Sequence, residues 1–152
     1  MKNGELHTLI DLLERSCLKF PENAYLWEKR EGGYRSVTYR QTRREVGDVA
    51  AGLLAGGLQK GDRVALLSEG CNDWVFAELG ILYAGGVNVP LSIKLTDKEL
   101  IFRVRHSGAR FLIVSDYYVA TLRRIEAELP EIEKIYVIRY SSAEEGKYNS
   151  FV

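Results

Sequence analysis

The sequence has few residues that bind transition metals, with only two cysteines and two histidines among its 152 residues. Cys17 and Cys71 are far apart and form no Cys-x-x-Cys motif. His7 and His106 do not add the spacing that a four-ligand zinc site needs. We therefore predict no metal-binding residue, and interpret the cysteines as two free thiols in a reducing cytoplasm.

The chain also lacks an excess of charge and a long hydrophobic run. Lys plus Arg and Asp plus Glu both total 21, so no overall field favours nucleic acid or an anionic membrane. The longest apolar stretch, Leu79–Leu91, is broken by glycines and a proline and is too short to cross a bilayer. The charged N-terminus lacks the continuous apolar core of a secretory signal. These absences favour a cytoplasmic protein with no nucleic-acid partner.

The remaining pattern alternates helices and strands within one domain's length of chain. Val64–Leu67 is apolar without alternation, which indicates a strand covered on both faces, as in a parallel sheet. After a hairpin around Glu31–Gly33, helix and strand alternate four times, which implies right-handed crossovers between parallel strands. We predict a three-layer α/β/α fold with a mostly parallel sheet, preceded by an N-terminal helix and a β-hairpin. The predicted helices are 7–18, 40–55, 73–84, 97–106 and 117–129, and the strands 24–29, 34–39, 63–67, 87–89, 111–114 and 134–139.

Several helix starts carry capping signals, in which a hydroxyl or amide side chain accepts from the first turn of the helix. Three of them have the two-residue form of a capping box, and the fourth is a single asparagine. They are Thr8 with Asp11, Thr38 with Gln41, Thr96 with Glu99, and Asn72.

The stretch Leu82–Leu91 combines a helix end, a Gly85-Gly86 break, a short strand and Pro90. We interpret this strand as an interior one that Pro90 ends. The polar residues 141–152 show no periodicity, and we treat them as a tail that leads into further sequence.

No motif in the chain forms a self-sufficient catalytic site. Gly56 and Gly61 have the spacing of a phosphate loop, but no Lys-Ser or Lys-Thr follows, and they precede a strand instead of following one. Ser68-Glu69-Gly70 lies between a strand and a helix, but lacks the glycine two positions before the serine that a nucleophile elbow has. We interpret it as a polar turn. No GxGxxG motif occurs.

The other candidate residues also favour structural roles. His106 lies at a helix end beside Arg103 and Arg105, where a cation suits the helix dipole and no partner carboxylate or nucleophile is indicated. The remaining basic and aromatic candidates fit solvated helix faces or core and hairpin packing; they are Arg40, Arg43, Arg44, Arg123, Arg124, Trp27 and Trp74. We therefore predict no catalytic, cofactor-binding or metal-binding residue.

Taken alone, this pattern leaves an independent ligand-binding or signalling module open. Doubly wound folds bind ligands beyond the carboxyl ends of their strands. The strand ends here are Ser68, Asn88 and Ser115-Asp116, and they lack the acidic cluster of a receiver domain.

Six short segments, in fixed order and spacing, point to a larger enzyme. They are Val37–Tyr39, Gly57–Ala65, Asn72 with Trp74, Ala84–Leu91, Thr96–Leu100 and Ser107–Arg110. Together they resemble the N-terminal part of the AMP-forming adenylating enzymes, the superfamily of acyl-CoA synthetases, luciferases and peptide-synthetase adenylation domains. The resemblance spans about residues 20–116.

This resemblance implies an activity for a longer protein. An acid would attack the α-phosphate of ATP, giving an acyl-adenylate and pyrophosphate, and CoA would then displace AMP. ATP, CoA and Mg²⁺ are implied for that enzyme, but its phosphate loop, acidic Mg²⁺ residue, ribose aspartate and catalytic lysine have no counterpart in this chain. Residues 1–140 would form the first part of its large N-terminal domain, and we expect this piece alone to be inactive.

The resemblance says least about which carboxylic acid the longer enzyme would take as its substrate. The segment Leu129–Ile138 and the charged helix before it look most like the long-chain fatty acyl-CoA synthetase branch. A fatty acid substrate, peripheral membrane contact and a homodimer follow as expectations.

Overall fold

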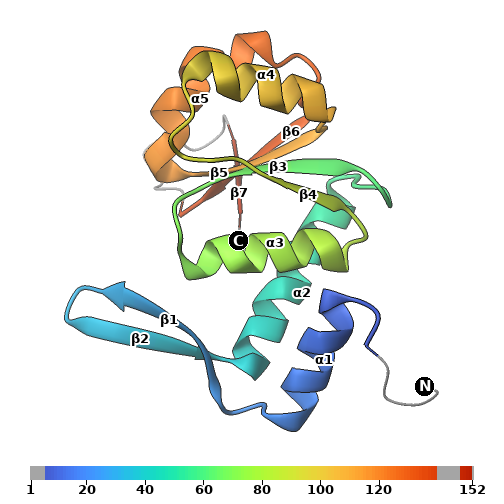
Figure 1. The fold of residues 1–152 in the computed structure, drawn as a ribbon, viewed down its shortest axis with the longest axis vertical. Helices are drawn as coiled ribbons and strands as arrows, with labels where there is room; N and C mark the ends of the chain where they lie inside the picture. Colours follow the sequence, from blue (N-terminus) through green and yellow to red (C-terminus); the bar gives the residue numbers. More distant parts are fainter. Residues whose placement is uncertain (1–5, 140–147, 152) are drawn as a thin grey trace.

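The computed structural model describes residues 6–139 and 148–151, which form a three-layer α/β/α domain with a hairpin beside it (Figure 1). Five strands form one parallel sheet in the order β4-β3-β5-β6-β7. Their bounds are β3 Arg63–Leu67, β4 Val87–Pro90, β5 Phe111–Ser115, β6 Lys134–Ile138 and β7 Asn149–Ser150. The predicted fold class is therefore confirmed.

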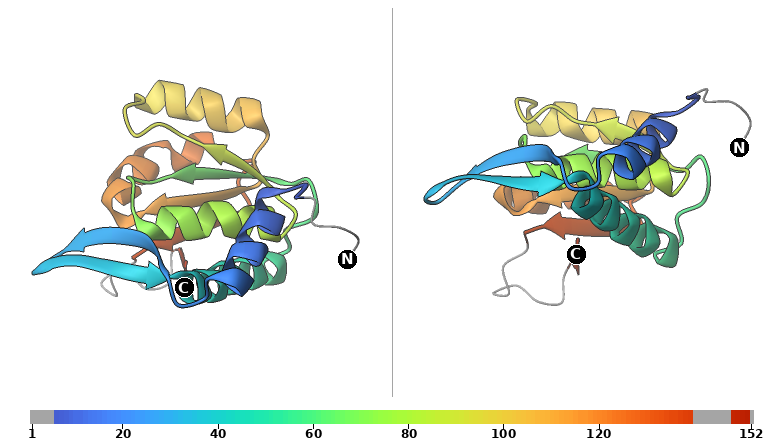
Figure 2. Two further views of the ribbon diagram at one scale, coloured as in Figure 1. Left: turned by 60° about the horizontal axis from the view of Figure 1, so that its bottom comes forward. Right: turned by 90° about the horizontal axis from the view of Figure 1, so that it is seen from below.

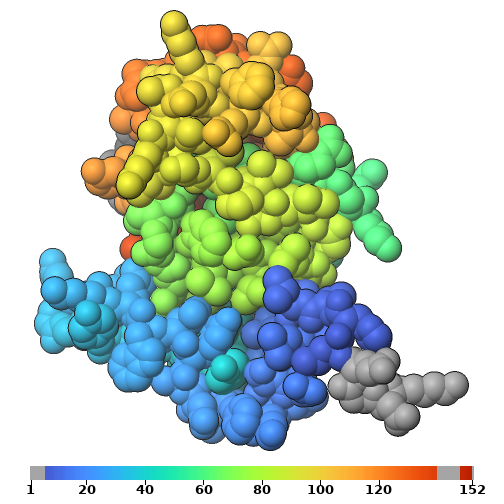
Figure 3. Space-filling view, in the orientation of Figure 1, coloured from blue at the N-terminus to red at the C-terminus, as the bar shows by residue number. Residues whose placement is uncertain are grey.

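The helices α2 (Tyr39–Ala55) and α3 (Asn72–Tyr83) cover one face of the sheet, and α1 (Leu9–Lys19) packs against these two helices on their outer side (Figure 1). Their apolar side chains meet alternate residues of the central strands in one core. The fully buried members of this core include Val46, Val64, Leu66, Phe111 and Ile113. In the space-filling view, the yellow-green residues of α3 lie between the blue N-terminal residues below and the yellow residues of α4 above (Figure 3).

The opposite face is covered by α4 (Asp97–Ser107) and by α5 (Val119–Ile125), which the short 3₁₀ turns η1 (Asp116–Tyr118) and η2 (Glu126–Glu128) flank. Ala65, Leu112 and Val114 point into this second core, so the central strands are buried on both faces. This double burial explains why β3 and β5 are apolar without alternation.

The hairpin pairs β1 (Ala24–Arg30) with β2 (Gly33–Thr38) in antiparallel register, with Arg30 opposite Gly33. Both glycines of the turn have positive φ, 84° at Gly32 and 137° at Gly33, which side-chain-bearing residues rarely adopt. The hairpin pairs with no strand of the parallel sheet and projects from the body of the domain (Figure 2).

All three predicted capping boxes are present, at Thr8, Thr38 and Thr96. The cap predicted at Asn72 is wrong. Cys71 is the N-cap of α3, without a side-chain hydrogen bond to the helix, while Asn72 is the first helical residue and is buried.

The interior position predicted for β4 is also wrong: among residues 6–139 and 148–151, β4 pairs only with β3 and is the outermost strand of the five-stranded sheet. Pro90 is its last residue, which an edge position tolerates because proline has no N–H to donate. The apolar stretch Leu79–Leu91 does not indicate which strand lies at the edge of the sheet.

The helix predicted over 117–129 is shorter, since only Val119–Ile125 is α-helical and 3₁₀ turns lie on either side. Pro130 disfavours helical backbone at Leu129, and 3₁₀ turns commonly form at helix ends. In the predicted tail, Asn149–Ser150 forms β7 beside β6 and Tyr148 is buried. The rest of that tail, 141–147 and 152, lies outside the described residues.

Among the helices of the described residues, none combines the length and the hydropathy that crossing a membrane requires.

Candidate functional site

The crevice of this sheet lies between the carboxyl ends of β3 and β5. These strands are neighbours, yet the chain leaves β3 toward α3 on one face and leaves β5 toward α5 on the other. Open α/β sheets bind ligands at the point where the connections from two neighbouring strands run to opposite faces of the sheet. The residues that follow the two strands are therefore the first candidates for a site.

The two strand ends are joined by a polar network. Ser115 is fully buried, and its hydroxyl donates to Glu69 Oε2 at 2.6 Å. The Ser68 hydroxyl, also buried, donates to the Glu69 carbonyl at 3.0 Å. Partial burial raises the pKa of Tyr118, and the nearby Glu69 carboxylate raises it further. The network fixes the Glu69 side chain across the crevice between β3 and β5.

Ser68 does not have the surroundings of a nucleophile. Its hydroxyl is 3.8 Å from Cys71 Sγ, and burial raises the pKa of that thiol. Neither of the chain's two histidines is placed to act as its base: His7 is an exposed residue before α1, and His106 stacks on Phe102. The geometry agrees with the interpretation of Ser68-Glu69-Gly70 as a polar turn.

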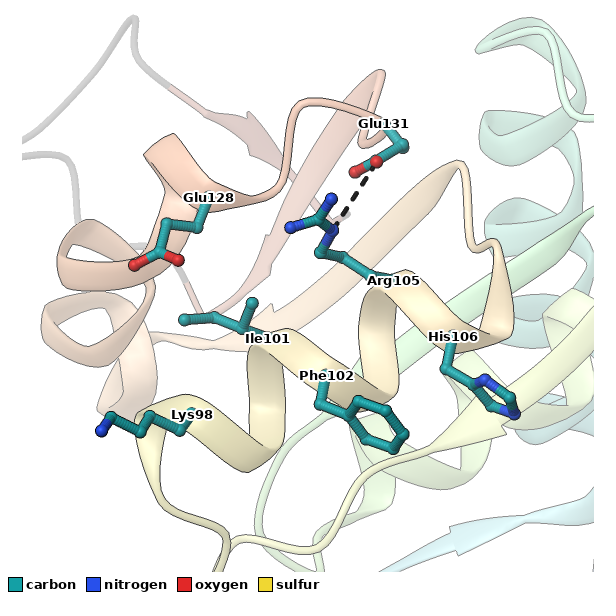
Figure 4. Close-up of a pocket in the computed structure, with 7 residues that line it drawn as sticks. All are labelled: Lys98, Ile101, Phe102, Arg105, His106, Glu128 and Glu131. Carbon is teal, nitrogen blue, oxygen red and sulfur yellow. Dashed lines mark ion pairs between the residues drawn. The ribbon is translucent and has the colours of Figure 1, made fainter.

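His106 lies beside a surface groove of about 680 Å³ between α4 and the segment that follows α5. Figure 4 shows Lys98, Phe102 and His106 along one side of α4, while Ile101 and Arg105 face the opposite wall. Arg105 pairs with Glu131 at 3.8 Å across the groove, and Glu128 lies further along that wall. Cations and carboxylates both line the groove, so its charge selects no class of ligand.

The basic helix faces are engaged in surface ion pairs, as expected of solvated faces. Each of four arginines has a carboxylate partner: Arg40 with Glu22, Arg43 with Glu14, Arg44 with Asp48, and Arg124 with Asp97. Exposed pairs of this kind contribute about 0–1 kcal/mol each.

The two tryptophans do not share a site. Trp74 is partly buried against the core of the α1–α3 face, as expected. The packing expected for Trp27 is wrong, because this side chain is 62% exposed on the hairpin.

Both cysteines are free thiols, and Cys17 donates to the Tyr39 carbonyl at 3.3 Å. Among the residues that the structure describes, no three His, Cys, Asp or Glu side chains converge as a metal-ligand set.

The opposite, amino edge of the sheet brings together segments that the sequence only placed in order. Arg63 donates through Nε to the Ser107 carbonyl at 3.0 Å and through Nη2 to the Gly108 carbonyl at 2.8 Å. Gly61 N–H donates to Gly85 O at 2.9 Å, and Val87 N–H to Asp62 O at 2.8 Å. Three of the six resembling segments therefore meet at the starts of β3, β4 and β5.

Arg110 completes this edge. Its guanidinium forms ion pairs with Asp62 at 2.5 Å and with Glu133 at 2.7 Å. Hydrogen bonds to Glu133 raise the pKa of Arg110 above its ordinary value, and the same bonds lower the pKa of Glu133. Sequence reasoning missed these contacts. Because neighbouring parallel strands begin at the same edge of the sheet, the charged residues just before each predicted strand were the available signal.

Sequence reasoning also missed Arg139, which follows β6 and donates to Asp73 Oδ2 at 2.7 Å and to Glu28 Oε1. Nothing in the sequence signals this contact, because Glu28 and Arg139 are 111 positions apart.

The comparison with known families gives a match to the family described as AMP-binding enzyme over residues 13–150. A crotonobetaine/carnitine–CoA ligase of Citrobacter koseri is 30% identical over 107 residues, which are 70% of this chain and 21% of that protein. An acyl-CoA ligase, sidI, of Aspergillus fumigatus is 32% identical over 74% of this chain and 18% of its own length.

Solved structures agree with these relatives. The anthranilate CoA ligase AuaEII, solved with anthranoyl-AMP, superposes with a TM-score of 0.86 at 29% identity, over 98% of this chain and 28% of that one. A long-chain-fatty-acid CoA ligase from Rhodopseudomonas palustris, described as putative, gives a TM-score of 0.82 at 23% identity, over 95% of this chain and 35% of that one, and this supports the fold alone.

The chain thus spans about a fifth of the length of the curated relatives that it matches. Its match to the family nevertheless covers nearly all of its residues, and its fold is that of the corresponding part of the solved anthranilate ligase. The chain belongs to the AMP-binding enzyme family.

Proposed function

We propose that this chain is the first part of the large N-terminal domain of an ATP-dependent acid–CoA ligase. Residues 1–140 form that part, and 141–152 lead into further sequence. The observation that carries the proposal is the family match over residues 13–150, together with relatives that are acid–CoA ligases. The complete enzyme would convert an acid, ATP and CoA into acyl-CoA, AMP and pyrophosphate.

The contribution of the present residues is structural. The crevice between β3 and β5 holds Glu69 bonded to Ser115, and the described residues hold neither a metal-ligand set nor a lysine-bearing phosphate loop. We assign no step of the reaction to these residues, and propose that the piece alone is inactive. ATP, CoA and Mg²⁺ would bind to the complete enzyme.

A long-chain fatty acid is the proposed substrate. The segment Leu129–Ile138, which resembles the long-chain fatty acyl-CoA synthetase branch, supports it. An aromatic acid is the second candidate, because the ligase at 29% identity is one for anthranilate. We further propose a cytoplasmic enzyme with peripheral membrane contact, since long-chain acids partition into membranes, and a homodimeric state.

Two experiments test this proposal. Sequencing the reading frame beyond Val152 should find a Ser/Thr/Gly-rich loop that ends in lysine; a stop codon there would contradict it. ATP–pyrophosphate exchange by the longer product, measured with fatty acids of several chain lengths and with anthranilate, then identifies the acid. Exchange with anthranilate but with no fatty acid would refute the long-chain assignment and leave the ligase assignment in place.

A further inference from the structure

The hairpin is joined to the carboxyl edge of the sheet by one cluster of charged residues. Arg139, the first residue after β6, donates through Nε to Asp73 at the start of α3 and through Nη2 to Glu28 in the middle of β1. We call Arg139 with Glu28 and Asp73 the Arg139 tether. Its members come from three separate elements, and the hairpin contributes only Glu28.

The backbone at Arg139 supports a specific role for these contacts. Its φ is 60°, the only positive φ at a non-glycine position among residues 6–139 and 148–151. A side-chain-bearing residue in this left-handed region is strained, and such strain persists only where surrounding contacts impose it. The two hydrogen bonds of the guanidinium are such contacts.

The tether is more shielded than the surface ion pairs of this chain. The Glu28 side chain is 13% exposed and that of Asp73 25%, compared with 68% and 70% in the Arg40–Glu22 pair. Burial alone would lower the pKa of Arg139, but its hydrogen bonds to Glu28 and Asp73 outweigh this and raise it. Partial shielding strengthens charge pairs, because less water competes for them.

Away from the tether, the hairpin has little to fix its orientation. Near its base, Leu26 and Val37 pack against the core and Tyr25 stacks on Tyr39, with ring centroids 4.5 Å apart. Toward its tip, residues 29–36 are exposed, and Tyr34 is 70% exposed. Two-stranded hairpins are at best marginally stable alone. Within the part of the chain that the structure describes, the base packing and the Arg139 tether are therefore the contacts that orient the hairpin.

We propose that the Arg139 tether is a conformational device: while it is closed the hairpin is held against the carboxyl edge of the sheet, and when it breaks the hairpin moves as a unit on its packed base. The titratable groups that face the tether are the Arg30 guanidinium on β1, the Cys71 thiol before α3, and the Glu45 carboxylate on α2. Arg30 binds the same carboxylate from within the hairpin, so it cannot hold the hairpin to the sheet.

Hydrogen exchange of the 152-residue chain, followed by mass spectrometry, tests this inference. Arg139→Met should accelerate exchange of the β1 and β2 amides about tenfold while β3 to β5 exchange as in the unchanged protein. Arg30→Met is the matched control, because it removes a cation from Glu28 without removing the tether, and should leave hairpin exchange unchanged. Unchanged hairpin exchange in Arg139→Met overturns the proposal, and so does equal acceleration of hairpin and sheet.

Two further measurements keep the test decisive if Arg139→Met does not fold. Glu28→Gln leaves Arg139 paired with Asp73 and should release the hairpin alone, with the same local rise in exchange. In the unchanged protein, about 1 M NaCl should accelerate hairpin exchange more than sheet exchange, because salt screens partly exposed pairs. Failure of both effects overturns the tether. These outcomes do not depend on ligase activity.

Discussion

The two edges of the parallel sheet differ in how their polar residues are used. At the amino edge, Arg63 and Arg110 bind backbone carbonyls and carboxylates that join the starts of β3, β5 and β6. At the carboxyl edge, Ser115 and Glu69 bond to each other across a crevice. Three of the six segments that resemble the adenylating enzymes meet at the amino edge. That edge therefore holds the fold together, whereas the carboxyl edge is where this topology offers room for a ligand.

The largest expected loss of stability follows Arg110→Met at the amino edge. The substitution removes the cation that Asp62 and Glu133 share, and the Asp62 side chain is only 14% exposed. The matched control is Arg105→Met, which removes an arginine from the exposed pair with Glu131. Thermal unfolding followed by circular dichroism should show a clear drop in Tm for the first variant and almost none for the second. Equal Tm values would contradict the role given to the amino edge.

Gly108→Ala is expected to lower the free energy of unfolding by about 1–2 kcal/mol, because φ at this helix end is +64°. The added Cβ would also lie 2.6 Å from Arg63 Nη2, the atom that binds the Gly108 carbonyl. Gly47→Ala in α2 is the control of opposite sign: nothing lies within 4 Å of its Cβ, and alanine in a helix should stabilise by about 0.5–1 kcal/mol. Urea denaturation measures both, and a neutral Gly108→Ala would refute the strain argument.

At the carboxyl edge, Ser115→Ala should cost about 1 kcal/mol, the usual loss for one buried hydrogen bond. The cost stays small because Glu69 is only partly buried and regains water. Ser36→Ala, on the exposed side of the hairpin, should change the free energy of unfolding by less than about 0.5 kcal/mol. A loss at Ser115 as large as at Arg110 would show that the two edges do not differ.

The smallest effect concerns pH. Burial would raise the pKa of Glu28, but hydrogen bonds from Arg139 and Arg30 outweigh it and hold the pKa below its ordinary 4.5. A carboxyl group with a lowered folded-state pKa adds stability above pH 4.5, and this stability is lost as pH falls through the lowered value. Glu28→Gln should remove this acid-sensitive part, about 1 kcal/mol or less. Urea titrations between pH 3 and pH 7 would show parallel pH curves if the assignment is wrong.

The sequence predicted local structure better than the position of each strand in the sheet. The capping boxes at Thr8, Thr38 and Thr96, and the glycine turn of the hairpin, depend on neighbouring residues and were correct. The edge position of β4 depends on the order of strands, which apolar runs do not encode. β7 was missed because two polar residues, Asn149 and Ser150, show no period and form a strand only beside β6.

Among the polar contacts too, local features were predicted from the sequence and long-range partners were not. Ser68 and Ser115 were recognisable as strand ends, but their common partner Glu69 became apparent only once β3 and β5 were neighbours. Arg110 was recognised as part of a segment, without its partner Asp62, which lies 48 positions away. Arg139 had no local signal of any kind. Side-chain pairs between distant segments require the three-dimensional fold.

We propose that these residues are the supporting part of an acid–CoA ligase whose reaction takes place on other residues of a longer chain. ATP–pyrophosphate exchange, measured in parallel on the 152-residue chain and on the longer product of its reading frame, tests this most directly. We expect acid-dependent exchange by the longer product and none by the 152-residue chain with any acid. Exchange catalysed by the 152-residue chain alone would contradict it.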